Sequence, residues 1–374
     1  LPSLELYKRC LASPYMSTML HHVLALSRRI IQFSIKVAAI VSAQRTASGV
    51  KLLALSGILY SLAGCGGDTA SSNTTPITVT PTPSPTPTPT PTTTSTATVL
   101  CPFSGSYQGT YSTSGSLTST WSWACSSTAR SLIANGLPNH TVGTFPNTGN
   151  PNTITAQNIR FSATLTPAKG ATNIAIGGPG GANAFSLPGV KFDPGTAGTC
   201  ASTITATSQC NLANGAGGTW RIEALGQNSF DFGEDANNAH VQPTGEYHYH
   251  GIPEGLLTNA GASDTNRKMV LVGWAGDGFP IYARYCYSTA TDATSAIKVC
   301  KGSYVKDTVA DPGRPATSLV PLGAFVSDWT YAAGTGDLDD CNGRTGVTPE
   351  FPDGIYYYMA TDSYPYFSRC VKGL

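Results

Sequence analysis

The sequence predicts a mainly β domain, an antiparallel sandwich-like fold with disulfides, after a targeting segment and a Pro/Thr-rich linker. Three observations support this prediction. Apolar and polar residues alternate over short segments, turn-forming residues separate these segments, and no stretch holds a 3.6-residue apolar period for more than about two turns. The 40 glycines and 26 prolines among 374 residues agree with frequent turns. Short strands with many turns are typical of sandwiches and related β folds.

The charge content excludes several classes of protein. Only 11% of the residues are charged, against a usual share of about 25%. This argues against a coiled coil and against charge-driven disorder, and the net charge of +1 offers no basic surface for nucleic acid. Residues 1–64 hold seven of the 22 Lys and Arg residues and one of the 21 acids, so the remainder has a net charge of −5. The chain therefore consists of two different kinds of sequence.

Residues 1–64 are predicted to be a signal or targeting segment. Lys51 precedes an apolar run that is too short to span a bilayer alone and ends in Leu-Ala-Gly before Cys65. This ending resembles the lipobox of bacterial lipoproteins, so Cys65 is the predicted lipidation site. The alternative is an ordinary secretory signal with a chance cysteine. Residues 1–49 are expected either to lie outside the native product or to form a long basic start of the signal.

Residues 65–100 are predicted to be a lipidated N-terminus and a linker. Seven prolines between residues 76 and 98, mostly alternating with threonine, favour an extended polyproline II conformation. Several acyl chains on Cys65 would hold the protein firmly to a membrane, which is then its expected partner. Asp68 lies three residues beyond Cys65 rather than beside it, so we expect an exported protein at the outer membrane or cell surface.

The cysteines agree with export. Apart from Cys10 and Cys65, eight remain, and an even count in an oxidising compartment favours disulfides. Eight cysteines allow 105 pairings, among which proximity favours neighbours in the sequence. If all eight pair, none remains as a nucleophile or as a ligand for a soft metal. The favoured pairs are Cys101–Cys125, Cys200–Cys210, Cys286–Cys300 and Cys341–Cys370.

Residues 101–374 are predicted to form one domain, because no internal repeat and no clear boundary interrupt them. Expected strands show either alternation or short apolar and aromatic runs bounded by Gly, Asp or Pro. The alternating segments are residues 154–165, 220–232 and 246–250, and the apolar or aromatic runs are residues 268–274 and 354–359.

The strongest chemical feature is a group of three histidines within eleven residues, His240, His248 and His250. Alternate residues of a strand share a face, so His248 and His250 should point one way while Tyr247 and Tyr249 point the other. The segment therefore predicts a histidine face and a tyrosine face.

The turn before these residues brings the third histidine close. Pro-Thr-Gly at residues 243–245 suits a type I turn followed by a left-handed glycine, a common three-residue hairpin loop. That register places His240 opposite His248 and Gln242 opposite Glu246. Directly opposed residues have Cβ atoms about 4.5–5.5 Å apart, so three imidazoles should share one small patch.

This crowding predicts a metal site formed by His240, His248 and His250, with His140 or Glu246 completing it. Neutral imidazoles bind divalent transition metals, and three of them with an open position suit zinc or copper. Two alternatives stay open. The histidines can be structural parts of a half-buried strand, or one imidazole can act as a general base without metal.

Other residues are weaker candidates. Asp235 and Asp277 are predicted as possible ligands of the ion or as partners that orient an imidazole, although Asp277 lies in a Gly-Asp-Gly turn. An oxygen-rich loop offers a candidate calcium site, but its spacing does not fit the EF-hand pattern. The side chains of this loop are Asp337, Asp339, Asp340 and Asn342.

The run Tyr247-His248-Tyr249-His250 resembles the motif that names the bacterial YHYH protein family. Three further motifs are similar to those of the family, and together they cover roughly residues 130–374. The resemblance implies an exported β-rich domain and brings no established reaction. The similar motifs are residues 135–140 with 145–147, residues 273–282, and residues 342–344 with 348–352 and 364–366.

The sequence therefore supports a surface- or periplasm-facing lipoprotein whose domain binds a transition metal through the histidines. A second reading is a metal-free adhesion or ligand-binding module in which tyrosines and Asn/Thr-rich loops contact a small molecule or a surface ligand. A third is a hydrolase that uses an imidazole base. The residues identify neither a substrate nor a reaction.

Overall fold

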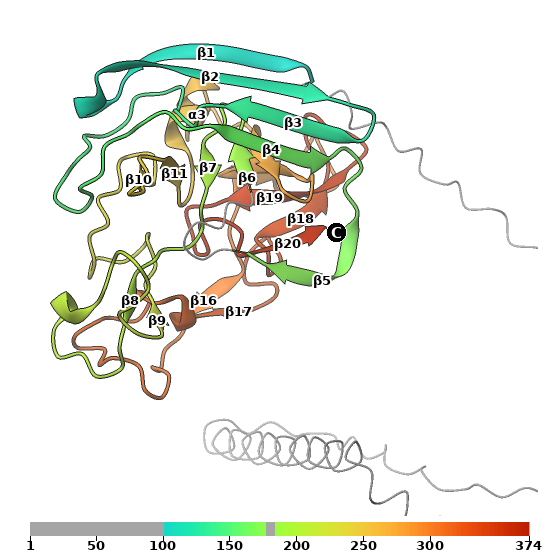
Figure 1. The fold of residues 1–374 in the computed structure, drawn as a ribbon. Helices are drawn as coiled ribbons and strands as arrows, with labels where there is room; N and C mark the ends of the chain where they lie inside the picture. Colours follow the sequence, from blue (N-terminus) through green and yellow to red (C-terminus); the bar gives the residue numbers. More distant parts are fainter. Residues whose placement is uncertain (1–100, 177–183, 374) are drawn as a thin grey trace, which may run out of the picture. The chain divides into compact units, whose positions relative to one another are not determined.

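The computed structural model describes residues 101–176 and 184–373 (Figure 1). Most of these residues lie in short strands, turns and loops, and the regular α-helix among them is α3 (Glu254–Asn259). The mainly β prediction is confirmed. The predicted targeting segment, the lipidation site Cys65 and the linker lie outside the described residues. Within the described ranges, no helix has the length and apolar character to cross a membrane.

The first sheet is antiparallel and follows chain order. It consists of β1 (Phe103–Thr110), β2 (Ser116–Cys125), β3 (Ala129–Ala134) and β4 (Ile159–Thr164). Its strands alternate between covered and solvent-facing residues, as expected for a sheet with one face on the core. The predicted strand at residues 154–165 is shorter than expected and corresponds to β4.

The second sheet has eight strands in the order β10-β11-β7-β6-β12-β13-β19-β18. Two of its neighbouring pairs, β11–β7 and β13–β19, are parallel, and the others are antiparallel. Parallel neighbours need long crossover connections, which local turn signals do not predict. The bounds are β6 (Ala184–Ser186), β7 (Lys191–Phe192), β10 (Ala239–Val241), β11 (Tyr247–Tyr249), β12 (Val270–Ala275), β13 (Pro280–Ala283), β18 (Gly343–Gly346) and β19 (Ile355–Ala360).

Four two-stranded pairs and three short 3-10 helices complete the described fold. Only the start of the predicted strand 220–232 is a strand, because Gly, Asn, Ser and Asp residues turn the chain after it. The strand pairs are β5 (Lys169–Ala175) with β20 (Cys370–Gly373), β8 (Thr199–Cys200) with β9 (Trp220–Arg221), β14 (Tyr285–Tyr287) with β15 (Ile297–Val299), and β16 (Tyr304–Lys306) with β17 (Trp329–Tyr331). The 3-10 helices are η2 (Ser112–Ser114), η3 (Thr207–Gln209) and η4 (Val326–Asp328).

The two larger sheets pack face to face. Trp123 and Leu132 of the first sheet share one buried apolar cluster with Trp274 and Met359 of the second. Figure 1 shows β1–β4 lying across the eight-stranded sheet. The guanidinium of Arg130 lies 3.7 Å from the centre of the Trp274 ring, which adds a cation–π contact between the sheets. The arrangement is therefore sandwich-like, and it leaves β10 and β11 at one end of the larger sheet.

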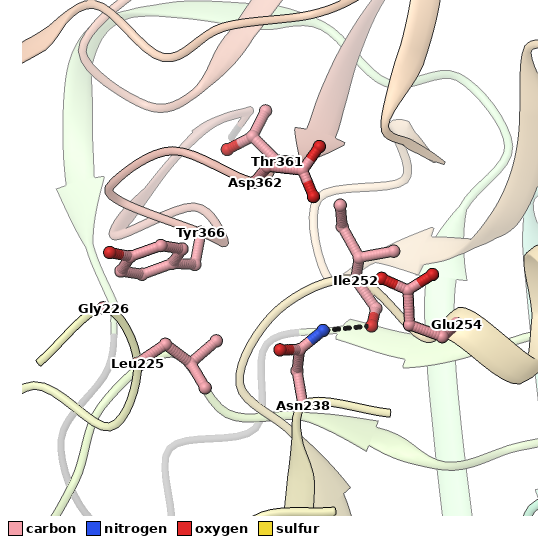
Figure 2. Close-up of a pocket in the computed structure, with 8 residues that line it drawn as sticks. All are labelled: Leu225, Gly226, Asn238, Ile252, Glu254, Thr361, Asp362 and Tyr366. Atoms are coloured by element: carbon pink, nitrogen blue, oxygen red, sulfur yellow. Dashed lines mark hydrogen bonds between the residues drawn. The ribbon is translucent and has the colours of Figure 1, made fainter. Parts of the chain in front are cut away.

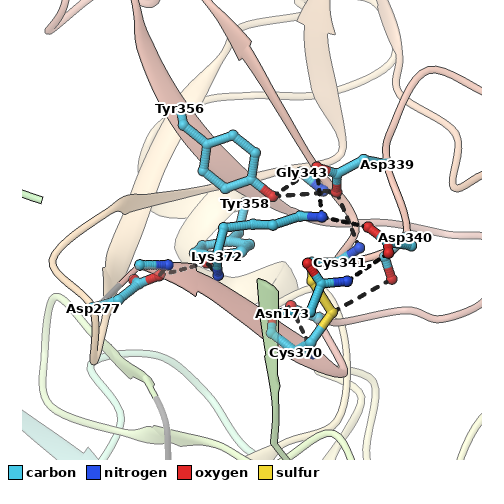
Figure 3. The surroundings of a disulfide bond; sticks show 12 residues. Asn173, Asp277, Asp339, Asp340, Cys341, Gly343, Tyr356, Tyr358, Cys370 and Lys372 are labelled. Carbon is cyan, nitrogen blue, oxygen red and sulfur yellow. Dashed lines mark hydrogen bonds and ion pairs between the residues drawn. A yellow bond between two sulfur atoms is a disulfide. The ribbon is translucent and has the colours of Figure 1, made fainter. Parts of the chain in front are cut away.

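All four predicted disulfides are present, Cys101–Cys125, Cys200–Cys210, Cys286–Cys300 and Cys341–Cys370. Each joins residues close in sequence and closes a loop of 10 to 29 residues, which limits the conformational freedom of the unfolded chain. Figure 3 shows the bridge from Cys341 to β20 at the C-terminal end of the domain.

Candidate metal centre

The predicted hairpin is confirmed. His240 on β10 pairs with His248 on β11. The loop closes through hydrogen bonds from Gln242 N to Glu246 O (2.9 Å) and from Gly245 N to Gln242 O (2.8 Å). Gly245 has a φ of 84°, which only glycine adopts readily, so the three-residue turn depends on it.

The hairpin turns three imidazoles toward one point. His250 Nε2 lies 3.1 Å from His248 Nε2 and 3.1 Å from His240 Nε2. The three ring centroids are 4.6–4.8 Å apart. His248 and His250 are each 2% exposed, while His240 is half-buried. We call these three residues the histidine triad; within the described part of the chain, their ligand atoms lie within 4.8 Å of one another.

Backbone carbonyls fix the tautomers of two triad members. His240 Nδ1 lies 2.8 Å from Phe232 O, and His248 Nδ1 lies 3.3 Å from Glu246 O. A carbonyl oxygen only accepts, so each Nδ1 carries the hydrogen and each Nε2 presents a lone pair to the cluster. A neutral His250 has at most one hydrogen on Nε2 and can satisfy only one neighbour. The triad therefore has more acceptors than donors at its centre.

Burial keeps the triad neutral. It lowers the pKa of His240 to about 4 and holds the pKa values of His248 and His250 well below their ordinary value. The positive charge of Lys191 lowers all three further, whereas Asp235 raises that of His240. Neutral imidazole is the form that binds metal ions, so at neutral pH the triad has the net charge that a bound ion would require.

Glu246 does not join the triad, because Lys191 holds its carboxylate. Lys191 Nζ lies 3.0 Å from Glu246 Oε2 and 3.4 Å from Asp193 Oδ2, and it donates to Gln242 Oε1 at 3.0 Å. Lys191 is itself 3% exposed and pairs with His248 across β7 and β11. Sequence reasoning missed this lysine, because a parallel pairing between distant segments positions it.

The structure does not bring His140 to the triad. Its Nε2 accepts a hydrogen bond from Tyr249 OH (2.6 Å), and its Nδ1 donates to Thr141 O (2.9 Å). Burial lowers its pKa, so it is neutral like the triad members. His140 therefore contacts the tyrosine face of the hairpin. Because alternate residues of a strand point to opposite sides, this face is separate from the histidine face.

Asp235 also lies on the tyrosine side. Its carboxylate accepts hydrogen bonds from Tyr247 OH at 2.8 Å and from the backbone N–H groups of Gly143 and Asn237. Asp277 is bound by Tyr358 OH at 2.6 Å and by Gly373 N at 2.8 Å, near the Cys341–Cys370 disulfide (Figure 3). Asp235 acts on the triad only through its charge, and Asp277 anchors β20.

Each aspartate of the predicted calcium loop forms an ion pair with a lysine. Lys372 Nζ lies 2.5 Å from Asp340 Oδ1 and 3.6 Å from Asp339 Oδ2, and Lys298 forms an ion pair with Asp337. Figure 3 draws Lys372 beside the two carboxylates. Asn342 uses its amide nitrogen for Met359 O and Thr361 Oγ1. The calcium prediction is therefore not supported. Lys372 of β20, which is distant in sequence, places its ammonium group beside the carboxylates of Asp339 and Asp340.

A second cluster contains Asp337 with Cys286 and Cys300. These two cysteines form a disulfide, so they present no thiolate to an ion. Among the described residues, the histidine triad is thus the better metal-ligating group.

A family model described as YHYH protein matches residues 160–373, more than half of the chain. The chain belongs to the YHYH family. The YHYH tetrad, residues 247–250, contributes two histidines to the triad and two tyrosines to the opposite face, and the third histidine comes from β10. No curated protein and no solved structure matches the chain.

Proposed function

We propose that this YHYH-family domain binds a divalent transition metal through His240, His248 and His250. The observation that supports this most is the convergence of three Nε2 atoms, with the Nδ1 hydrogens of His240 and His248 turned outward to carbonyls. Zinc-to-nitrogen bonds of about 2.0–2.1 Å place two tetrahedral ligands about 3.3 Å apart. The two separations from His250 Nε2, both 3.1 Å, are close to this value, and the ligand atoms of all three residues lie within 4.8 Å of one another.

Zinc and copper both suit three imidazoles, and the ligand type does not choose between them. Three protein ligands leave a fourth position, which a water molecule or a substrate oxygen can occupy. His240 is the triad member that keeps some contact with solvent. A site with three imidazole ligands and one open position is suited either to metal storage or to a reaction at the open position.

The proposed setting is the surface of a membrane, reached through a lipid on Cys65. The support comes from the sequence alone, namely the apolar run before Cys65 and the proline-rich segment after it. Expression in a bacterial host with a radiolabelled fatty acid tests the anchor. The native chain should incorporate label, and Cys65→Ser should abolish it and release the protein from membranes.

A metal-free ligand-binding module is the second candidate function. The 3.1 Å Nε2 separations are also ordinary hydrogen-bond lengths, so a proton shared within the triad can hold the rings together. In this case the histidines only stabilise the hairpin, and substitution would lower stability without changing metal content.

Elemental analysis of the purified full chain distinguishes metal binding from the metal-free ligand-binding function. After removal and reloading of metal, the native chain should retain about one equivalent of zinc or copper per chain, and His248→Ala should lose it. His140→Ala is the matched control, because it removes a buried imidazole from the tyrosine face and should retain the metal. Equal metal content in the native chain and His248→Ala would contradict the proposal.

A further inference from the structure

The outer edge of the first sheet presents a row of backbone groups away from the domain. β1 stands first in the order of that sheet, and Figure 1 shows it as the outermost strand. Thr120 of β2 lies opposite Ser106, and its N–H and C=O both bond to Asn135 on the β3 side, at 3.0 and 3.1 Å. In an antiparallel pair, this leaves the N–H and C=O of Ser106 pointing away from β2.

The same direction repeats at every second residue, so Ser104 and Gln108 also present their backbone N–H and C=O groups at this edge. Within residues 101–176 and 184–373, no group donates to them or accepts from them. The side chains of Ser104, Ser106 and Gln108 are exposed on the outward face of the sheet. The edge therefore has hydrogen-bonding groups that only water or another chain can bond.

The other edges of the two larger sheets carry the usual protection against pairing, which is a short strand or a charged side chain. β10 has three residues, β18 has four and contains Arg344, and β4 exposes Arg160. β1 differs from them. It pairs with β2 over eight residues in unbroken register, and no charged residue occurs from Cys101 to Ala129.

A cavity of about 250 Å³ is the contrasting case (Figure 2). Its two carboxylates, Glu254 and Asp362, are both bound by Arg284. The amide nitrogen of Asn238 donates to Ile252 O at 2.9 Å. These bonds lie within the chain, so they give no reason for a ligand, whereas the backbone groups at the edge of β1 do call for a partner strand.

We propose that β1 pairs antiparallel with β1 of a second copy of this chain, with Ser106 of both copies at the two-fold axis. Ser104 of one copy then lies opposite Gln108 of the other, so the outward backbone groups of the two edges bond to each other. Each copy contributes the same edge, so the contact closes as a dimer and does not extend into a fibre. The proposal goes beyond the metal site and does not depend on it.

The inner side chains of β1 fit this register. Phe103 and Tyr107 are half-buried, and they alternate with Gly105 and Gly109. With Ser106 at the axis, Phe103 lies opposite Gly109 of the second copy, and Tyr107 lies opposite its Gly105. Each aromatic ring thus faces a residue without a side chain, and no two large groups compete for the same space. A cavity of about 450 Å³ with Tyr107 in its wall adjoins this face of the strand.

The absence of charge favours an identical partner. Like charges directly opposite each other destabilise a strand pair, and a two-fold axis would bring every charge of the edge close to its own copy. The uncharged segment from Cys101 to Ala129 avoids this repulsion. It also gives no attraction to a charged peptide.

Disulfide formation between copies tests the register. The background is the full chain with Cys10→Ser and Cys65→Ser, because the other eight cysteines are paired. Ser106→Cys should form a covalent dimer under mild oxidation, since directly opposed Cβ atoms lie about 4.5–5.5 Å apart. Ser104→Cys and Gln108→Cys are matched controls on the same exposed face. Each lies more than about 13 Å from its own copy, so neither should dimerise alone, but a mixture of the two should form the mixed dimer.

Sedimentation of the purified full chain over a concentration series measures the association. The contact is small, so we expect a reversible dimer with a Kd between about 1 μM and 1 mM. Ser106→Lys should raise this Kd at least about tenfold, because it places two ammonium groups opposite each other. Ser131→Lys puts the same charge on the outward face of β3, away from the edge, and is the matched control with the native Kd. His248→Ala should lose metal and keep the dimer.

Thermal unfolding verifies that each variant is folded. If Ser106→Lys unfolds, Ser106→Pro replaces it, because proline removes the outward N–H and is tolerated on edge strands. A native chain that stays monomeric up to about 1 mM would overturn the proposal. So would a Kd that Ser106→Lys and Ser131→Lys change equally, or equal disulfide yields at residues 104, 106 and 108, which would indicate random collision.

Discussion

The two faces of the β10–β11 hairpin use the same backbone for opposite purposes. On the tyrosine face, Tyr247 donates to Asp235 and Tyr249 donates to His140, so each polar group finds a partner within the protein. On the histidine face, three Nε2 atoms meet with too few hydrogens to satisfy them. In both His140 and His240 the Nδ1 atom donates to a backbone carbonyl, so the two faces differ in what the Nε2 atom meets, which is a hydroxyl donor for His140 and other imidazole nitrogens in the triad.

The largest expected effect comes from removing one ligand on the histidine face. His250→Ala should weaken zinc or copper binding at least about a hundredfold, because loss of a ligand leaves only two imidazoles. Competition with a coloured chelator measures the affinity. The same substitution on the other face, His140→Ala, should leave the affinity unchanged; equal losses in both variants would remove the distinction between the faces.

Acid should destabilise the metal-free chain through the triad. The folded pKa values lie below 6.5, so the unfolded chain takes up protons first as the pH falls. The stabilising contribution is complete above pH 6.5 and declines below it, by about 1.4 kcal/mol per pH unit for each histidine. For His240 this decline should end near pH 4.

Urea unfolding of the metal-free chain at a series of pH values measures this dependence. The slope between pH 6.5 and 4 should decrease in His240→Gln, which has no titrating ring. A slope that is the same in the native chain and in His240→Gln would show that this ring is not held neutral by the fold.

An intermediate effect is expected on the tyrosine face. Tyr249→Phe leaves buried His140 Nε2 without its donor, which should lower the free energy of unfolding by about 1–3 kcal/mol. Tyr247→Phe should cost less, because Asp235 keeps two backbone donors. Denaturant unfolding measures both. Metal content should stay at the native level in each, and a loss of metal would show that the faces are coupled.

The smallest effect is expected at the edge of the triad. Glu246→Gln removes a charge that offsets Lys191, so the ammonium should repel a bound cation slightly more. We expect a two- to fivefold loss of metal affinity, which corresponds to about 1 kcal/mol or less. Gln242→Glu adds a carboxylate beside the same lysine and should shift the affinity in the opposite direction. A hundredfold loss in Glu246→Gln would instead indicate that Glu246 is a ligand.

Local patterns predicted the parts of the site that are close in sequence. The turn at residues 243–245 and the alternation of side chains along a strand predicted the pairing of His240 with His248. The short sequence distance between neighbouring cysteines predicted all four disulfides. These features depend on short loops, whose geometry the residues themselves determine.

Contacts between distant segments were not predictable in the same way. Lys191 reaches Glu246 through a parallel strand pair, and Lys372 reaches Asp340 from the last strand. Both lysines form ion pairs with carboxylates that the sequence pattern predicts as metal ligands. His140 likewise has an imidazole that could bind a metal ion, but the fold places this ring against Tyr249. Residue type alone could not reveal these partners.

X-ray absorption spectroscopy on the zinc- or copper-loaded full chain measures directly whether the three imidazoles bind the metal ion. We expect a first shell with three imidazole nitrogens at about 2.0 Å in the native chain and in His140→Ala, and no such shell in His248→Ala, which should not retain the metal. A first shell without imidazole, or one that is the same in the native chain and His248→Ala, would contradict the metal proposal.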